Sequence, residues 1–228
     1  MISFKGRHHQ QDIIIQCVRW YVAYSLSYRD LEELMQERGY AVDHSTIHRW
    51  VVHYAPRIEK VFRKNKKHTG HHWRLDETYL KIRGEWRYLY RAIDKQGKTI
   101  DFLLTAKRDK KAAKRFLIKA IGSNGKPSLI NIDKSGANTA GIKQYNREEN
   151  KRVKIRQCKY LNNIVEQVVR HSDHRFIKRR TRPMLGFKSF WSARATLAGI
   201  ELWRMLKKGQ NKSSLPAWAQ FYELAARG

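Results

Sequence analysis

The hydrophobic period changes at Trp73, and this change constrains the fold of the 228-residue chain more than any other feature. From this residue onward three segments alternate apolar and polar side chains, as half-buried strands do. They are residues 73–82, 85–93 and 98–105, separated by Arg83-Gly84 and by Lys95-Gln96-Gly97. Connections this short between consecutive strands predict an antiparallel meander.

Helices and strands alternate after the meander. We expect a helix at 109–121 ending at Gly122, a strand at 128–132, a helix near 137–146, a strand around 153–156 and a long helix from about 161. A strand reached through a helical crossover lies parallel to an earlier strand. The order βββαβαβα therefore predicts a mixed α/β sheet with helices on its faces, which matches the ribonuclease H-like architecture.

Three carboxylates stand in apolar settings of these predicted elements. Asp76 interrupts the first strand in WRLDETYLK, Asp133 ends the apolar run of INIDKSGAN, and Glu166 follows Ile-Val in YLNNIVEQ. Sites of open α/β sheets cluster at strand ends, so we predict that these catalytic acids converge. Oxygen ligands of this kind suit Mg²⁺ or Mn²⁺, and two such ions support phosphoryl transfer. The alternative is three unrelated surface acids.

The charge balance indicates a polyanionic partner. The chain has 48 Lys+Arg against 20 Asp+Glu, a formal net charge of +28. An excess of this size favours nucleic acid, with binding that weakens steeply as salt rises. A ribosomal-type protein is the usual alternative for so basic a chain. However, 7 Trp, 11 Tyr and 8 Phe indicate a substantial packed core.

The N-terminal segment has the pattern of three helices. A first helix at 12–24 would place Ile13, Cys17, Trp20 and Tyr24 on one buried stripe. Ser27 is a predicted N-cap with Asp30 three residues on, and that helix should stop at Gly39. A third helix, STIHRWVVHYA, should start at Asp43 or Ser45 and end at Pro56. Helix, glycine-containing turn and helix predict a helix-turn-helix, the alternative being an ordinary three-helix bundle.

In a helix-turn-helix, the N-terminal side chains of the second helix meet base edges in the major groove. The candidate DNA-binding residues are His44, Ser45, Thr46, His48 and Arg49, with Ile47, Trp50 and Val51 facing inward. Residues 57–72 form a basic connector that we expect to contact phosphates. Its histidines lack a Cys or acid at ligand spacing and are not assigned to a metal.

These patterns divide the chain into three parts. Residues 1–65 form the helix-turn-helix domain with its linker, 66–206 the catalytic core and 207–228 a tail that includes the amphipathic LPAWAQFYELAA. The tail could pack on its own domain or on a neighbouring subunit. Trp191 and Trp203 are interpreted as core residues. Cys17 and Cys158 are isolated and show no metal-type spacing, which indicates reduced thiols. The sequence has neither a signal-peptide pattern nor an apolar run of membrane-spanning length, so we expect a cytoplasmic protein.

Nearly the whole chain resembles the DDE transposases of insertion-sequence family six, a family of compact bacterial elements. SLSYRDLEELMQERGYAVDHSTIHRWV resembles the family's helix-turn-helix, and WRLDETYLKIRGEWRYLYRAIDKQGKTIDF its first catalytic block. NIDKSGAN and KYLNNIVEQ resemble the second and third, and DHRFIKRRTRPMLGFKSFWSARATLAGIEL the end of the domain.

The resemblance implies a function and partners. Asp76, Asp133 and Glu166 would hold divalent metal, two ions in all, while the protein binds terminal inverted repeats, cleaves there and joins the ends to target DNA. Phosphate contacts would come from Lys159, Lys178, Arg179 and Arg180. Family members act as homodimers or larger homo-oligomers. The resemblance also implies a bacterial protein that is associated with the nucleoid and not attached to a membrane.

One departure from the family pattern concerns the third catalytic block. The family has a basic residue seven positions after the glutamate, whereas the matching Lys178 stands twelve positions after Glu166, because residues 168–172 intervene. In an unbroken helix the seventh position lies roughly 20° from the face of the glutamate, and the twelfth about 120° away. A new helix capped by Ser172 or Asp173 would let the extra residues bulge out.

Three functions remain open from the sequence. The first is an active transposase. The second is a catalytically inactive, degenerate transposase or a DNA-binding repressor, which needs only the basic N-terminal region. The third is a structure-specific nuclease that cleaves DNA without joining it.

Overall fold

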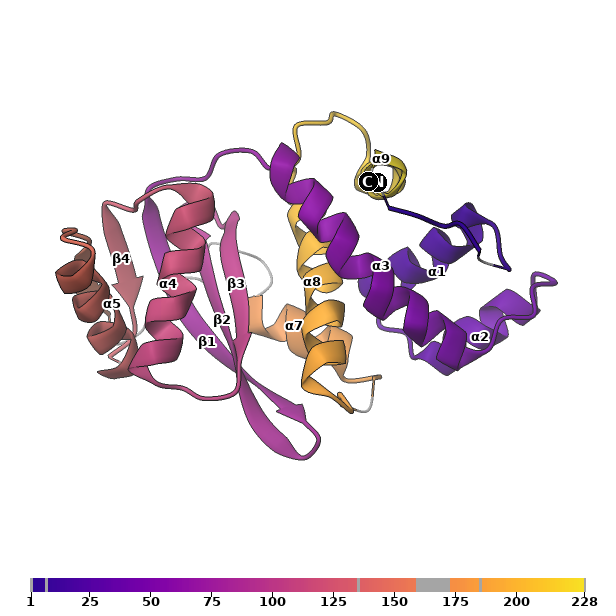
Figure 1. Cartoon of the computed structure of the whole chain (residues 1–228), viewed down its shortest axis with the longest axis horizontal. Coiled ribbons are helices and arrows are strands. Elements are labelled where there is room, and N and C mark those ends of the chain that lie inside the picture. Colours follow the sequence, from indigo (N-terminus) through magenta and orange to yellow (C-terminus); the bar gives the residue numbers. More distant parts are fainter. Residues whose placement is uncertain (1, 7, 135, 159–172, 185, 228) are drawn as a thin grey trace. The chain divides into compact units, whose positions relative to one another are not determined.

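The computed structural model describes residues 2–6, 8–134, 136–158, 173–184 and 186–227 (Figure 1). The chain forms two compact units, one combining Met1–Lys67 with Phe176–Gly228 and the other comprising His68–Arg175. The first boundary lies close to the predicted one at 65/66. Residues 176–206 pack with the N-terminal helices, and the predicted end of the catalytic core at residue 206 stays a prediction.

The sheet unit contains one five-stranded mixed sheet. Its strands are β1 (His72–Ile82), β2 (Glu85–Asp94), β3 (Thr99–Thr105), β4 (Leu129–Ile132) and β5 (Lys154–Gln157). The spatial order is β3-β2-β1-β4-β5, with antiparallel pairing between β1, β2 and β3 and parallel pairing of β4 with β1 and β5. This confirms the predicted ribonuclease H-like mixed sheet. The helix predicted from about 161 begins outside the described residues.

Two turns explain why the meander forms. Arg83 and Gly84 join β1 to β2 with φ angles of 52° and 82°, the left-handed pair that a two-residue type I′ turn requires. Asp94 organises the next turn, since its carboxylate accepts hydrogen bonds from the amides of Gln96 at 3.0 Å and Lys98 at 2.8 Å. The amide of Gly70 donates to the same carboxylate at 2.9 Å, which fixes the approach to β1.

Two helices pack over the sheet and build its core. They are α4 (Lys110–Asn124) and α5 (Gly136–Glu148). The core joins strand residues such as Trp73 and Ile130 to Phe116 of α4 and Ile142 of α5. A Cβ on Gly141 would lie 2.6 Å from the Cβ of Ala113, so the close approach of the two helices depends on this glycine.

The helix α4 ends later than predicted. Gly122, the expected terminus, lies inside the helix, and the chain leaves it at Gly125, whose φ of 80° is left-handed. The amide of Gly125 donates to the carbonyl of Ile121 at 2.9 Å. The sequence offers two glycines three residues apart, and only the second adopts the left-handed conformation that ends a helix.

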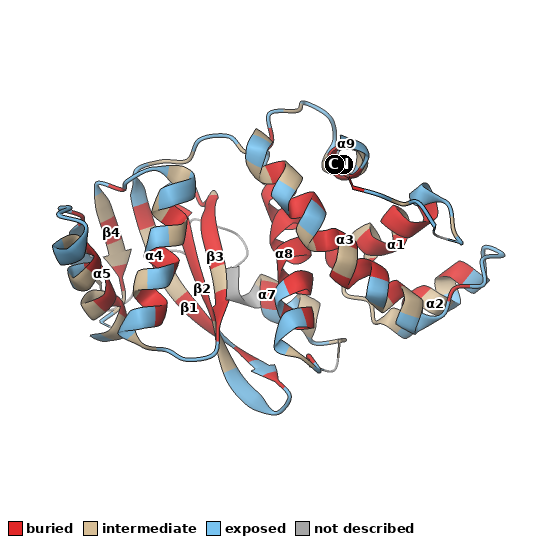
Figure 2. Ribbon diagram, in the orientation of Figure 1, coloured by how far each residue is buried: buried red, intermediate tan, exposed pale blue. Residues whose placement is uncertain are grey.

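The helical unit is built around a buried helix. Its elements are α1 (Gln11–Ala23), α2 (Tyr28–Gln36), α3 (His44–Asn65), the end of α7 (Asp173–Thr181), α8 (Phe190–Lys207) and α9 (Ala217–Arg227). Every residue of α8 from Ala195 to Leu206 is buried (Figure 2). A Cβ on Gly199 would lie 2.6 Å from Val22 Cγ1 and 2.9 Å from the Cβ of Ala55, so α1, α3 and α8 cross in close contact here.

The predicted boundaries of α2 are confirmed. The amide of Asp30 donates to Ser27 Oγ at 3.1 Å and the amide of Ser27 to Asp30 Oδ2 at 2.7 Å, which forms the capping box. Gly39, with φ 78°, follows the helix, and the amide of Tyr40 donates to the carbonyl of Met35 at 2.9 Å. This is the Schellman arrangement, with Gly39 at C′.

The predicted end of α3 at Pro56 is wrong, because the helix continues to Asn65. Proline removes one amide donor, but a helix survives this loss where its apolar face is strongly buried. Ile58 and Phe62, two and six residues beyond Pro56, are fully buried. The guanidinium of Arg57, the residue after the proline, donates to the carbonyl of His53.

Three assignments of aromatic residues also need correction. In α1, Trp20 is half-buried and the following Tyr24 is 48% exposed, because the helix presents Tyr21 and Val22 inward. In α8, Trp203 is buried as predicted, whereas Trp191 is 63% exposed.

The tail packs within the helical unit. Phe221 of α9 is fully buried, and its ring lies 6.4 Å from that of Trp203 in an edge-on contact. Nowhere in the described chain is a helix long and apolar enough to cross a membrane.

Candidate active site

Neighbouring parallel strands bring Asp76 and Asp133 together. The register of β1 against β4 pairs Trp73 with Ile130 and Arg74 with Asn131, so Asp133 stands level with Asp76 just beyond the last paired residues. Adjacent strands are separated by about 4.8 Å, so the two residues lie at one edge position. Both are partly exposed, and Asp76 Oδ1 accepts a hydrogen bond from the amide of Glu77 at 2.8 Å.

A buried ion pair beside these aspartates was not predicted. The side chain of Glu77 is 2% exposed, and Arg108 donates to its two carboxylate oxygens, from Nε at 3.4 Å and from Nη2 at 3.5 Å. Arg108 Nη2 also lies 3.8 Å from Asp133 Oδ2, and its Nη1 lies 3.1 Å from the hydroxyl of Tyr79. A single guanidinium thus connects β1, the end of β3 and the acid that follows β4.

The sequence contained a signal for Glu77. Trp73 and Leu75 point inward, so the period of two places Glu77 on the same face, where a carboxylate requires a partner. Burial raises the pKa of Glu77, Arg108 opposes this rise, and the negative charges of Asp133 and Asp76 add to it. Arg108 is remote in sequence and carried no comparable signal.

A second cation lies opposite Asp76. Arg91 of β2 is the cross-strand partner of Asp76, and directly opposed residues of an antiparallel pair project from the same face. Arg91 is buried, and its Nη2 donates to Thr99 Oγ1 at 3.3 Å. Each aspartate therefore has an arginine close to it, Arg91 near Asp76 and Arg108 near Asp133.

The two aspartates fit a hard divalent cation. They supply carboxylate oxygens at an accessible edge, the donor type that Mg²⁺ and Mn²⁺ prefer. Within the described residues no three His, Cys, Asp or Glu side chains are grouped as a metal site. The third predicted ligand, Glu166, lies outside those residues, as does Lys159.

The predicted DNA-reading residues lie at the start of α3. Asp43 caps this helix, because its carboxylate accepts hydrogen bonds from the amides of Ser45 at 2.9 Å and Thr46 at 3.0 Å. The hydroxyls of Ser45 and Thr46 donate to the same carboxylate, and these bonds lower the pKa of Asp43. Ser45 and Thr46 therefore hold the helix end in shape.

The other three candidates differ in exposure. His44 is exposed, with Nδ1 2.9 Å from Glu32 Oε2, and Arg49 is exposed, with Nη2 donating to Thr46 Oγ1 at 2.7 Å. His48 is half-buried against the ring of Tyr28 at 5.3 Å, and burial lowers its pKa. Among the five candidates, His44 and Arg49 thus combine exposure with a side chain long enough to reach a groove.

The predicted phosphate-binding residues of α7 fall into two groups. Lys178 and Arg179 are exposed. Arg180 is half-buried, and its guanidinium lies over the ring of Phe176 at 5.2 Å. Burial lowers the pKa of Arg180. Arg180 packs on Phe176, and its contact with phosphate stays a prediction.

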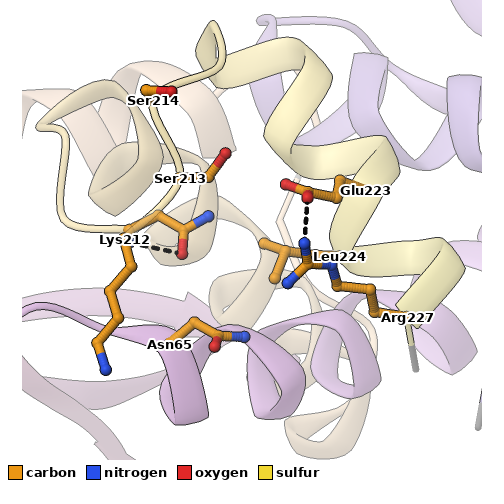
Figure 3. A pocket seen from close by; sticks show the side chains of 8 residues that line it. Asn65, Lys212, Ser213, Ser214, Glu223, Leu224 and Arg227 are labelled. Atoms are coloured by element: carbon orange, nitrogen blue, oxygen red, sulfur yellow. Dashed lines mark hydrogen bonds and ion pairs between the residues drawn. The ribbon is translucent and has the colours of Figure 1, made fainter.

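A pocket of about 330 Å³ lies within the helical unit, between the end of α3, residues 211–214 and α9 (Figure 3). Arg227 pairs with Glu223 across one wall at 2.5 Å, and the amide of Lys212 donates to Asn211 Oδ1 at 2.9 Å. None of the predicted site residues lines this pocket.

Comparison with known sequences gives long matches. Residues 70–210 match a family described as a DDE domain. The chain is 37% identical over 232 residues to the transposase for insertion sequence-like element IS431mec of Staphylococcus aureus strain Mu50, covering 99% of this chain and 98% of that protein. The transposase for insertion sequence element IS257 in transposon Tn4003 of Staphylococcus aureus gives the same identity and coverage.

Solved structures give more distant matches. The catalytic core domain of HTLV-2 integrase in complex with magnesium is 16% identical, with a TM-score of 0.44 over 68% of this chain and 97% of that one. The catalytic core domain of BIV integrase is 15% identical, with a TM-score of 0.45 over 69% of this chain and 97% of that one.

Proposed function

Because the chain belongs to the DDE transposases of insertion-sequence family six, we propose that it binds the terminal inverted repeats of its own element, cleaves there and transfers the ends to target DNA. The observation that carries this proposal is the parallel β1–β4 register that sets Asp133 level with Asp76. Two carboxylates on one accessible sheet edge match the first two acids of the family pattern. Such a protein acts on DNA in the bacterial nucleoid.

Asp76, Asp133 and Glu166 would hold Mg²⁺ or Mn²⁺. Divalent cations at such sites polarise phosphoryl oxygens and stabilise both the attacking and the leaving oxygen of an in-line displacement. Cleavage breaks the bond between phosphorus and the 3′ oxygen, with water as nucleophile, and leaves a 3′-hydroxyl. In strand transfer that hydroxyl attacks a phosphodiester of the target, and a target 3′-hydroxyl is released.

The arginines of the site have separate tasks. Arg108 holds the buried carboxylate of Glu77 and lies beside Asp133, so it fixes the relative position of the two strands that bear the aspartates. Arg91 offsets the negative charge of Asp76 from the adjacent strand. Both reduce the repulsion between carboxylates that metal binding would otherwise have to overcome.

DNA recognition is assigned to the helical unit. The helix-turn-helix of α2 and α3 presents His44 and Arg49 from the N-terminal end of α3, and the amide donors of that end are already satisfied by Asp43. Arg49 can make a bidentate contact to guanine, the commonest specific contact in the major groove. Lys178 and Arg179 would follow the phosphate backbone, as would Lys159. Assembly into dimers or larger homo-oligomers would pair two element ends.

A metal-dependent cleavage assay tests this function. The unmodified chain is incubated with end-labelled inverted repeats in Mg²⁺, in Mn²⁺ and in a chelator. We expect cleavage at the repeat end with either metal, none with the chelator, and none from Asp133→Asn. Cleavage that survives chelation or this substitution would refute the carboxylate–metal site.

A second candidate, a DNA-binding protein without strand chemistry, is favoured by one observation. Lys178, on α7, stands twelve residues after Glu166 instead of seven. Specific binding to the repeats combined with no cleavage in either metal would establish this candidate. Cleavage without joining would instead identify a nuclease.

A further inference from the structure

The β1–β2 hairpin extends beyond the strands that flank it. β3 pairs with β2 only as far as Tyr88, opposite Thr105, and β4 pairs with β1 only at His72–Arg74. Among the described strands, residues 80–87 pair only with one another, and they project as a two-stranded arm (Figures 1 and 2). Leu80 and Ile82 of this arm are buried, whereas Lys81 and Trp86 are exposed. An isolated two-stranded arm is marginally stable in water, so its aromatic side chains call for an explanation.

Three aromatic side chains line one face of this arm. Tyr79 is the cross-strand partner of Tyr88, and Lys81 is the partner of Trp86, so the period of two sets all four on the same face. The ring of Tyr79 lies 5.3 Å from that of Tyr88 and 6.5 Å from that of Trp86. We name Tyr79, Trp86 and Tyr88 the aromatic strip. Trp86 is 58% exposed and Tyr79 is 43% exposed.

The aromatic strip continues from the ion pair of Glu77 and Arg108. Its face of β1 continues from Glu77 through Tyr79 to Lys81. The hydroxyl of Tyr79 lies 3.1 Å from Arg108 Nη1, and the same guanidinium lies 3.8 Å from Asp133. Asp76 projects from the opposite face of β1, so the strip adjoins the carboxylate site through Arg108 and Asp133, and a DNA strand held at Asp133 has a path over Tyr79 toward Trp86.

The charge of the arm identifies the occupant. Lys81 is exposed beside Trp86, and Arg83 occupies the turn with a φ of 52°, a strained conformation for a non-glycine residue. The acid of the turn, Glu85, is paired with Arg87. A second copy of a chain with net charge +28 would be repelled by this arm, whereas a phosphate backbone would be attracted.

We propose that the aromatic strip binds unpaired bases of the DNA end, with the indole of Trp86 stacking on a base while Lys81 and Arg83 contact the adjoining phosphates. Aromatic faces accept any base, and grooves for single strands combine such faces with cations. This inference rests on the proposed function for the identity of the DNA. If the strip binds unpaired bases, the protein should bind DNA ends that are frayed or single-stranded next to the reacting phosphate more tightly than fully paired ends.

Binding to two DNA probes tests the proposal without any need for catalysis. One is a fully paired repeat end, and the other carries several unpaired nucleotides with 2-aminopurine among them. Both are measured with Asp76→Asn protein in a chelator, so a lack of strand chemistry cannot affect the result. We expect Trp86→Ala to weaken binding of the unpaired probe by about 5- to 100-fold, while binding of the paired probe stays unchanged.

Two further variants separate stacking from folding. Trp86→Phe keeps an aromatic face and should retain most of the affinity and of the 2-aminopurine quenching. Trp218→Ala removes a comparably exposed indole, 56% exposed on α9, and should change neither probe. Equal affinities of Trp86→Ala and the unmodified chain for the unpaired probe would overturn the proposal. So would a Trp86→Ala protein that binds this probe normally but sediments as a smaller oligomer, since the strip would then be an interface between copies.

Discussion

Arg108 donates to both carboxylate oxygens of Glu77, at 3.4 and 3.5 Å, and Glu77 is almost fully buried next to Asp76. The first acid of the catalytic pattern thus stands beside a second, inaccessible one. Arg108 stabilises this arrangement, and because it also lies beside Asp133 it connects β1 to the acid that follows β4. The pair lies on the face of β1 that carries the core, opposite to the face of Asp76.

A double-mutant cycle measures this pair. Arg108→Gln should lower the free energy of unfolding by about 1–3 kcal/mol, because it leaves a buried carboxylate without its cation. In the background of Glu77→Gln the same change should cost much less, since the neutral amide needs no counter-charge. Urea unfolding of the four proteins at pH 7 gives the coupling. Additive effects would show that the two side chains act independently.

The pH dependence of stability should report the burial of Glu77. Burial raises the pKa of Glu77 in the folded chain, so its contribution to stability is fully present below the unfolded pKa of about 4.3 and is lost as pH rises through the folded value. Lowering the pH from neutral should therefore stabilise the unmodified chain relative to Glu77→Gln, which cannot titrate. Unfolding of both proteins at several pH values tests this. A stability difference that moves in the opposite direction would contradict it.

Two glycines of the sheet unit should respond oppositely to alanine. At Gly141 a Cβ would meet Ala113 at 2.6 Å, so Gly141→Ala should destabilise by about 1–3 kcal/mol through overpacking. Gly122 lies inside α4 with open space around its Cα, so Gly122→Ala should stabilise by up to about 1 kcal/mol. Melting temperatures should move in opposite directions. A Gly141→Ala protein with the same melting temperature as the unmodified chain would mean that α4 and α5 can separate at little cost in free energy.

Sequence patterns predicted the parts of the fold that depend on local spacing. The capping box of Ser27 and Asp30, the Schellman glycine Gly39 and the strand alternation from Trp73 were all readable without the structure. Asp76 and Asp133 could be expected near one another once the strand order was known. Their level register required the parallel pairing itself.

What the sequence did not reveal depends on tertiary packing. Pro56 normally ends a helix, but burial of Ile58 and Phe62 carries α3 past it. Trp191 and Trp203 both suggested core, and only the packing of α8 separates them. Arg108 reaches Glu77 across a fold that no local pattern specifies. The placement of α8 with the N-terminal helices likewise depends on contacts such as Gly199 against Val22 and Ala55.

The displaced basic residue gives a further prediction. If Lys178 contacts DNA despite standing twelve residues after Glu166, then Lys178→Gln should lower strand transfer by the unmodified chain, because a phosphate contact is lost. Lys207→Gln, which removes an exposed lysine at the end of α8, is the matched control and should have no effect. Full activity of Lys178→Gln would mean that another residue supplies this contact. Activity that appears only after residues 168–172 are deleted would identify an inactivated copy.

Strand transfer by purified protein tests the carboxylate site most directly. Labelled repeat ends and a target plasmid are incubated with the unmodified chain, with Asp76→Asn and with Asp12→Asn, which makes the same chemical change at an exposed position of α1. We expect joined product in Mg²⁺ or Mn²⁺ from the unmodified chain and from Asp12→Asn, and none from Asp76→Asn. Joined product from Asp76→Asn, or its absence from all three proteins, would contradict it.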